Sequence, residues 1–202
     1  MGIFSRITAK SNLKSGKALL ESALDAQGDE ADRLFTQACS KFEVVVNSGA
    51  LVVEGLHQWA LALNSQAKTR DGQEAENLLN QSYTKYTAAL VIEPKNHEIL
   101  NDWGATIMDH ARALNADPDH VLYQQAKEKF LAAGKLFPGI SAYNLACIDS
   151  LQNDLQSCEE QLTAAWARGN LPPLDYIKAD SDLVNISESE WFQEFLESKV
   201  RY

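Results

Sequence analysis

Apolar residues recur three and four positions apart along almost the whole chain, which is the spacing of an amphipathic α-helix. The alternation of β-branched and polar residues that is typical of strands is absent. The pattern therefore predicts an all-α protein whose helices come in pairs. The expected helices cover residues 8–27 and 29–47, 51–69 and 73–92, 97–115 and 118–136, and 141–152 and 155–167.

Glycine, proline and aspartate indicate where some of these helices begin and end. Gly28 separates the first two helices, and Gly49 ends the second. Asp117 is expected to cap the helix that follows it, with Pro118 in the first helical position, where its missing N–H costs nothing.

The size pattern of the side chains repeats with a step of 44 residues. Small residues fall on small ones and large residues on large ones, in the sets Gly16/Ala60/Gly104, Ala38/Ser82/Ala126, Phe42/Tyr86/Phe130 and Val45/Ala89/Ala133. Two helices approach closely only where a small side chain faces a large one. The repeat therefore predicts similar helix pairs that stack into an array, with a fourth, shorter copy after residue 140.

Composition and charge exclude several classes of protein. An apolar share of 45% is too high for a disordered chain. The formal charge of -10 opposes binding to the phosphates of nucleic acid. No apolar run reaches the roughly 20 residues of a membrane helix, and the N-terminus has no secretory signal. The three cysteines show no CxxC spacing, which indicates reduced thiols and a cytoplasmic protein.

The fourth copy resembles a tetratricopeptide repeat. Its first helix carries Tyr143-Asn144-Leu145-Ala146, and its second helix carries Cys158, Leu162 and Ala165 at the positions where that family alternates small and large residues. The second and third copies follow the same scheme, and the first follows it less closely. The resemblance implies an all-α, right-handed α-solenoid of about four helix pairs plus a C-terminal capping helix.

The repeats are longer than the usual tetratricopeptide unit. They look like the repeats of some bacterial members of the family and, more loosely, those of the plant mitochondrial import receptor, whose C-terminal membrane anchor has no counterpart here. The segment after the last repeat resembles the end piece of the bacterial proteins. Ser187 and Glu190 form a capping box that predicts a closing helix over residues 188–199. We therefore expect a repeat array over residues 1–170 and a capping segment over 171–202.

The resemblance also implies a concave groove that is lined by the first helix of each pair and holds a peptide or helix of a partner protein. The positions that carry over are Lys10, Leu13, Lys14 and Lys17, then His57, Gln58 and Leu61, then Glu98, Asn101 and Asp102, and finally Tyr143, Asn144 and Cys147. One subclass of the family grips the terminal carboxylate of chaperones with cations where Glu98 and Asp102 stand here, so that ligand is excluded. The hypothesis is a non-enzymatic interaction module whose ligand places at least one basic residue near the third copy.

Other interpretations stay open. Glu98 and Asp102 are also typical of a solvated helix face in an acidic protein. The basic residues before Glu21 are expected to be a Lys-rich helix start, with contact to an anionic membrane or to an acidic face of a second copy as alternatives. A self-assembling oligomeric scaffold is the alternative function, which salt-sensitive oligomers would favour.

Catalytic chemistry has little support in the sequence. The four histidines show no zinc-binding spacing with one another or with cysteine, and no phosphate loop or nucleophile elbow occurs. We therefore expect no enzyme activity, no metal and no cofactor. Cys147 is predicted to face the groove beside Tyr143, and its labelling at neutral pH checks the catalytic alternative.

Overall fold

The computed structural model describes residues 3–200, with side chains described over 5–198. This part of the chain contains helices and turns and no strand. In chain order its helices are α1 Ile3–Asp25, α2 Gly28–Asn47, α3 Val52–Ala67, α4 Gly72–Ile92, α5 His97–Ala113, α6 Val121–Leu136, α7 Ala142–Leu151, α8 Leu155–Ala167, α9 Leu174–Ala179, the 3₁₀ helix η1 Ser181–Leu183, and α10 Glu190–Val200.

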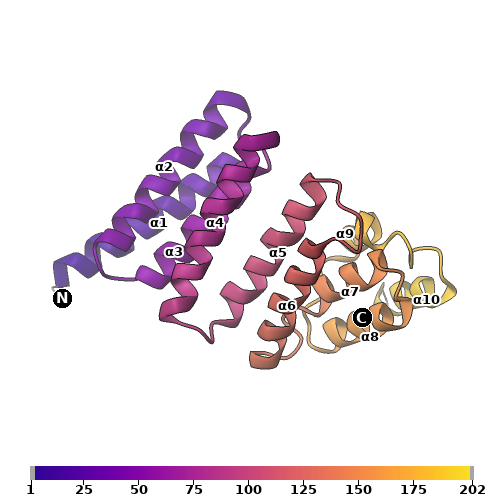
Figure 1. Ribbon diagram of the computed structural model, residues 1–202. Coiled ribbons are helices and arrows are strands. Elements are labelled where there is room, and N and C mark those ends of the chain that lie inside the picture. Colours follow the sequence, from indigo (N-terminus) through magenta and orange to yellow (C-terminus); the bar gives the residue numbers. More distant parts are fainter. Residues whose placement is uncertain (1–2, 201–202) are drawn as a thin grey trace.

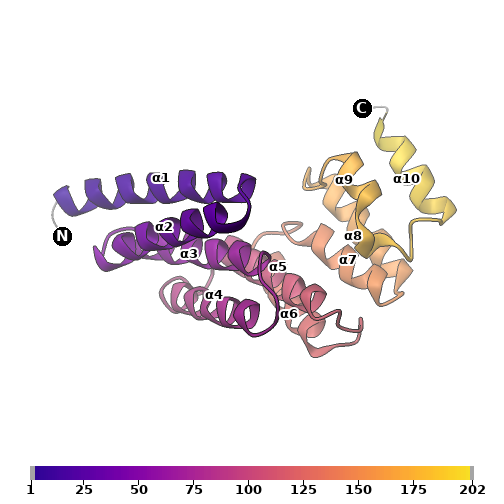
Figure 2. The same ribbon diagram turned by 90° about the horizontal axis from the view of Figure 1, so that it is seen from above.

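The helices form an elongated array of successive pairs, with α1 at one end and α10 at the other (Figures 1 and 2). Each of the pairs α1–α2, α3–α4, α5–α6 and α7–α8 packs along its length, and α2 also packs against α3. The prediction of an α-solenoid of four helix pairs with a closing helix is confirmed for the described residues.

The repeated sizes act where the two helices of a pair cross. A Cβ atom built on Gly16 would lie 2.6 Å from Cε1 of Phe42, and one built on Gly104 would lie 2.6 Å from Cε1 of Phe130. Both rings are fully buried. Glycine therefore allows α1 to approach α2, and α5 to approach α6, against an aromatic ring.

A second pair of residues repeats with the same step. Lys85 Nζ lies 3.6 Å from the centre of the Trp59 ring, and Lys129 Nζ lies 4.0 Å from the centre of the Trp103 ring. Each is a cation–π contact of about 0.5–1 kcal/mol between the two helices of one repeat. The tryptophans therefore stabilise the repeat through their faces as well as through burial.

The start of α6 differs from the prediction. The helix begins at Val121, three residues after the expected position of Pro118. The His120 N–H donates to the Asp117 carbonyl at 2.8 Å and closes a turn, and His120 Nδ1 accepts from the Leu122 N–H at 3.3 Å. His120 is therefore the capping residue, because Asp117 and Pro118 belong to the turn before the helix.

The cap of α10 also differs from the predicted capping box. Ser189 Oγ accepts from the Phe192 N–H at 3.1 Å, whereas Ser187 Oγ donates to the Val184 carbonyl at 2.9 Å. The turn that precedes α10 engages Ser187, so Ser189 caps the helix and Glu190 is its first residue.

The buried apolar residues fall into three clusters within the described part of the chain. One cluster joins α1, α2 and α3, and a large one joins α5 to α8 with the C-terminal segment. That segment contributes Ile177, Leu183, Ile186 and Phe192, among others. The middle cluster, between α3, α4 and α5, contains five buried residues. Polar contacts therefore contribute a larger share of the packing between the second and third repeats than they do where the apolar clusters are larger.

Candidate functional site

The candidate site is a groove made of two hollows that meet at Leu51 and Glu54. The first hollow, of about 640 Å³, lies between the start of α3 and the turn from α4 to α5. The second, of about 510 Å³, lies along α1. The first is lined by Gly49, Leu51, Val52, Val53, Glu54, His57, Ile92, Glu93, Asn96, Glu98 and Ile99, and the second by Lys10, Leu13, Lys14, Lys17, Ala18, Glu21, Leu51 and Glu54.

The two hollows differ in charge. The first contains the carboxylates of Glu54, Glu93 and Glu98 and no lysine or arginine, around an apolar lining. The second contains three lysines and two glutamates. Lys17 and Glu54 form an ion pair of 3.0 Å where the hollows meet, so they largely neutralise each other. Cationic groups of a ligand are therefore favoured in the first hollow, which we call the acidic hollow.

Leu51 holds an uncommon backbone conformation at this junction. Its φ of 57° lies in the left-handed region, which costs a residue other than glycine about 1–2 kcal/mol. Its carbonyl accepts from the Gly55 N–H at 2.8 Å and so begins α3. The Leu51 side chain lines both hollows and also packs against the apolar cluster of α1, α2 and α3.

The structure brings six of the thirteen predicted groove residues to these hollows: Lys10, Leu13, Lys14, Lys17, His57 and Glu98. Glu98 is exposed and has no ion pair or hydrogen bond with any side chain in the described range. Gln58 and Leu61 lie on α3 outside the hollows, half-buried, and Leu61 packs against the middle cluster.

Other predicted groove residues bind neighbouring helices instead. His57 Nε2 donates to Asp102 at 2.8 Å, which joins α3 to α5. Asn101 Oδ1 accepts from Ser141 Oγ at 2.9 Å and from Asn144 Nδ2 at 3.3 Å, which joins α5 to α7. Asp102, Asn101 and Asn144 therefore hold the first helices of successive repeats in place, and their polar groups are occupied.

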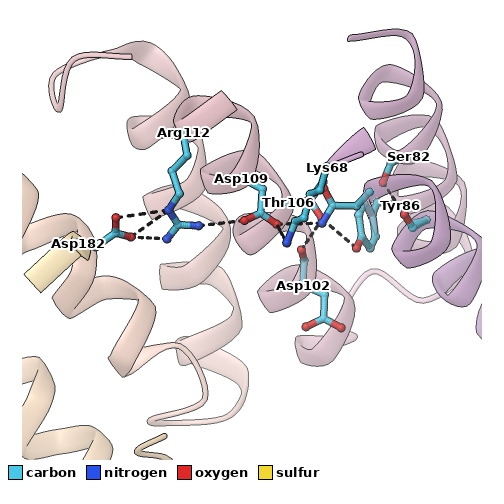
Figure 3. A network of polar contacts seen from close by, with 10 residues as sticks. Lys68, Ser82, Tyr86, Asp102, Thr106, Asp109, Arg112 and Asp182 are labelled. Carbon is cyan, nitrogen blue, oxygen red and sulfur yellow. Dashed lines mark hydrogen bonds and ion pairs between the residues drawn. The ribbon is translucent and has the colours of Figure 1, made fainter. Parts of the chain in front are cut away.

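This row of polar contacts continues to the C-terminal segment (Figure 3). Asp109 accepts from Asn64 at 3.0 Å and pairs with Lys68 at 2.7 Å and with Arg112 at 2.9 Å. Arg112 also binds the carboxylate of Asp182, which is buried. Burial acts to lower the pKa of Arg112. The bonds with Asp182 have the opposite effect and outweigh it, so the pKa of Arg112 is raised.

Tyr143 and Cys147 lie beneath the C-terminal segment rather than in an open groove. The Tyr143 hydroxyl donates to Asp180 Oδ2 at 2.7 Å, and the Cys147 thiol lies 3.7 Å from the same oxygen. Both side chains are buried. Burial, followed by the nearby Asp180 and Asp182 carboxylates, raises the pKa of the Cys147 thiol. The expectation that Cys147 faces the groove is therefore wrong, because residues 180–182 cover that face of α7.

The chain matches the model of a known protein family. Residues 30–152 match the family model described as the plant-specific mitochondrial import receptor subunit TOM20, which is well over half of the chain. The chain belongs to this family. No curated protein and no solved structure matches it. The TOM20 match covers α2 to α7 and so includes the acidic hollow.

Membership of the TOM20 family corrects one prediction and refines others. The cytoplasmic localisation is wrong, because the family consists of mitochondrial import receptor subunits. The sequence resembled both bacterial tetratricopeptide proteins and the plant import receptor, and the family match is to the receptor. The tetratricopeptide assignment itself stays a prediction. A receptor family agrees with a protein-binding, non-enzymatic role. None of the helices in the described range is long and apolar enough to span a membrane.

One cluster has the composition of a metal site. Ligand atoms of Cys147, Asp180 and Asp182 lie within 4.8 Å of one another. However, Asp182 is engaged by Arg112, Asp180 accepts from Tyr143 and from the Asp182 N–H, and the raised thiol pKa opposes the thiolate that a metal binds. These side chains are better described as the anchor of the C-terminal segment in this TOM20-family chain.

A second cluster has the composition of a catalytic triad. Tyr83 Oη bonds to His110 Nδ1 at 2.9 Å, and His110 Nε2 bonds to Glu76 at 3.1 Å. Burial, followed by the charges of Glu76 and Asp109, raises the pKa of Tyr83, so the phenol keeps its proton. The arrangement therefore connects α4 to α5 and supplies no activated nucleophile.

The thiols allow a direct check on the absence of a cysteine nucleophile. We expect iodoacetamide at neutral pH to leave Cys147 and Cys158 unmodified in the folded protein, because burial raises both thiol pKa values, that of Cys158 to about 12. Mass spectrometry after digestion measures the modification. The same treatment in urea should modify all three cysteines. Fast labelling of Cys147 without urea would contradict the buried anchor.

Several residues of the acidic hollow lie at turns and do not follow from the groove-lining pattern. Leu51, Val52, Ile92, Glu93 and Asn96 line the acidic hollow from the ends of helices and the turns between them. The groove-lining pattern considers only one face of each first helix, so it omits turn residues. One sequence signal for such residues is the apolar pair Val91-Ile92, which stands at the end of α4 just before Glu93-Pro94. No further helical turn follows this pair, so its side chains are left uncovered.

Proposed function

We propose that the groove binds an amphipathic segment of a partner protein whose basic residues lie in the acidic hollow. The observation that carries this proposal is the lining of that hollow, where the exposed Glu93 and Glu98 lie beside apolar side chains and no lysine or arginine is present. Glu54, at the edge of the hollow, is paired with Lys17. Apolar contacts with Leu51, Val52 and Ile92 supply area, and the carboxylates select the charge of the ligand.

The TOM20 family match supports this choice of ligand. An import receptor subunit acts on proteins destined for mitochondria, and their targeting segments are amphipathic, rich in arginine and poor in acidic residues. Such a segment meets both demands of the acidic hollow. A preformed groove orders few groups on binding, and we expect micromolar affinity, about -8 kcal/mol.

Glu98→Lys tests the proposal. Fluorescence anisotropy with a labelled, arginine-rich amphipathic peptide that lacks acidic residues measures the affinity. Reversing this exposed charge replaces attraction by repulsion, so we expect about tenfold weaker binding, equivalent to about 1.4 kcal/mol. Glu43→Lys makes the same charge change on an exposed site of α2 that lines neither hollow, and it should change the affinity little.

The comparison of the two variants separates a local effect from a general one. Equal weakening by both would show that only net charge attracts the peptide. Absence of any binding by the unaltered protein would overturn the proposed ligand class. Circular dichroism confirms that both variants fold, and both substitutions are at solvent-exposed positions, so loss of structure is not expected.

A further inference from the structure

The two ends of the array carry opposite charge. The first twenty residues contain Arg6, Lys10, Lys14 and Lys17 and no acidic residue. Residues 179–202 contain six carboxylates and two basic residues, Lys199 and Arg201. Asp180 and Asp182 are engaged by Tyr143 and Arg112, so the remaining four carboxylates, all glutamates, give this end its acidic character. Since α1 and α10 lie at opposite ends of the molecule (Figures 1 and 2), the charges do not neutralise each other within one chain.

On α1 the free basic side chains share one face. Arg6, Lys10 and Lys14 are spaced four residues apart, and all three are exposed. They form no ion pair with any residue in the described range, in contrast to Lys17, which pairs with Glu54. Ile7 lies on the same face and is 59% exposed. We call these four residues the basic stripe.

On α10 the acidic side chains also share one face. Glu190, Glu194 and Glu197 follow the spacing i, i+4 and i+7, and all three are exposed and without an ion pair in the described part of the chain. We call them the acidic stripe. Beside it a hollow of about 390 Å³ is lined by Trp166, Trp191 and Phe195 together with Thr163, Glu194 and Ser198.

We propose that the basic stripe of one molecule docks on the acidic stripe of a second copy of this chain. The spacing lets successive cations face successive carboxylates when two helices lie side by side, and Ile7 then supplies an apolar side chain next to the tryptophan-lined hollow. The two surfaces differ, so the contact is heterologous and each copy keeps one free basic and one free acidic end. Such contacts build chains or closed rings. They engage Lys10 and Lys14 of the second hollow and leave the acidic hollow between α3 and α5 uncovered.

Two variants, each with the charge of one end reversed, test this contact by sedimentation velocity. The first variant combines Lys10→Glu with Lys14→Glu, and the second combines Glu190→Lys with Glu194→Lys. The unaltered protein should form oligomers whose average mass rises with concentration and falls when salt is raised from about 0.01 M to about 1 M, which shortens the screening length from about 30 Å to about 3 Å. Each variant alone should stay monomeric, because like charges meet at every contact.

An equal mixture of the two variants should associate again, since each end of one then finds an opposite charge on the other. Circular dichroism of each variant controls for folding. A monomeric unaltered protein at low salt, variants that associate as it does, or a mixture that stays monomeric would each overturn the proposal. Peptide binding in the acidic hollow is measured separately, so either proposal can fail alone.

Discussion

Replacing Phe130 by alanine should lower the free energy of unfolding by about 3–5 kcal/mol, the largest effect of any single substitution considered for this chain. The ring is fully buried, belongs to the largest apolar cluster and lies against Gly104 of the neighbouring helix. Removing it leaves a cavity that close helix packing cannot fill. Chemical denaturation followed by circular dichroism measures the change.

Neighbouring and conservative substitutions keep the Phe130 prediction testable even where the alanine variant does not fold. Leu131→Ala removes an adjacent side chain that is 46% exposed, and it should change stability by about 0.5 kcal/mol or less. Phe130→Leu should fall between the two. Similar stability of the alanine variants at 130 and 131 would show that the two helices of the third repeat do not cross where the structure places them.

Two glycines in the third repeat should respond to alanine with opposite signs. Alanine is favoured over glycine in a helix by about 1 kcal/mol. At Gly104 the added Cβ would lie 2.6–2.9 Å from atoms of the Phe130 ring, so overpacking of about 1–3 kcal/mol outweighs that gain. At Gly134 nothing lies within 4 Å of the added Cβ, so the helix preference acts alone.

Thermal unfolding distinguishes the two glycine variants. Gly104→Ala should melt about 2–4 °C below the unaltered protein and Gly134→Ala about 2–4 °C above it, since each net effect is about 1 kcal/mol and that corresponds to about 2–4 °C for a domain of this size. Stabilisation of both variants would mean that Gly104 has no packing role. The 44-residue repeat of small and large side chains would then not be explained by helix crossing.

The core was predictable from sequence because it depends on side-chain size and helical spacing. Phe42, Tyr86 and Phe130 recur with the step of 44 residues, and each is fully buried. The tetratricopeptide resemblance implied that the first helices line a groove, and Lys10, Lys14 and Glu98 do lie in the two hollows, while their part in binding stays a prediction. Both results follow from one repeated geometry, so each copy of the repeat supports the others.

The pairing of polar residues was not predictable from that periodicity. Asp102 lies on the predicted face of α5, but the sequence does not show that His57, 45 residues earlier, would engage it. Tyr143 and Cys147 also lie on the predicted face of α7, and the C-terminal segment covers them through Asp180. A repeat pattern describes one unit and its neighbour. It does not describe how an irregular segment folds back over the last unit.

The polar row along the first helices has a consequence for binding. His57–Asp102 and Asn64–Asp109 join α3 to α5 beside the acidic hollow, where the apolar cluster between the repeats is small. These contacts fix the relative position of the two helices before any ligand arrives. Binding then requires little reordering of the groove, and this preorganisation favours affinity.

The central claim is that carboxylates of the acidic hollow contact basic residues of a bound segment, and a double-mutant cycle tests it most directly. Anisotropy gives the affinities of the unaltered protein and of Glu98→Lys for the arginine-rich peptide and for versions in which each arginine in turn is glutamate. At one peptide position, the arginine-to-glutamate change should restore affinity for the Glu98→Lys variant. The coupling energy of that pair should be about 1 kcal/mol and should decrease as salt is raised. Additive effects at every position of a peptide that binds would contradict the claim.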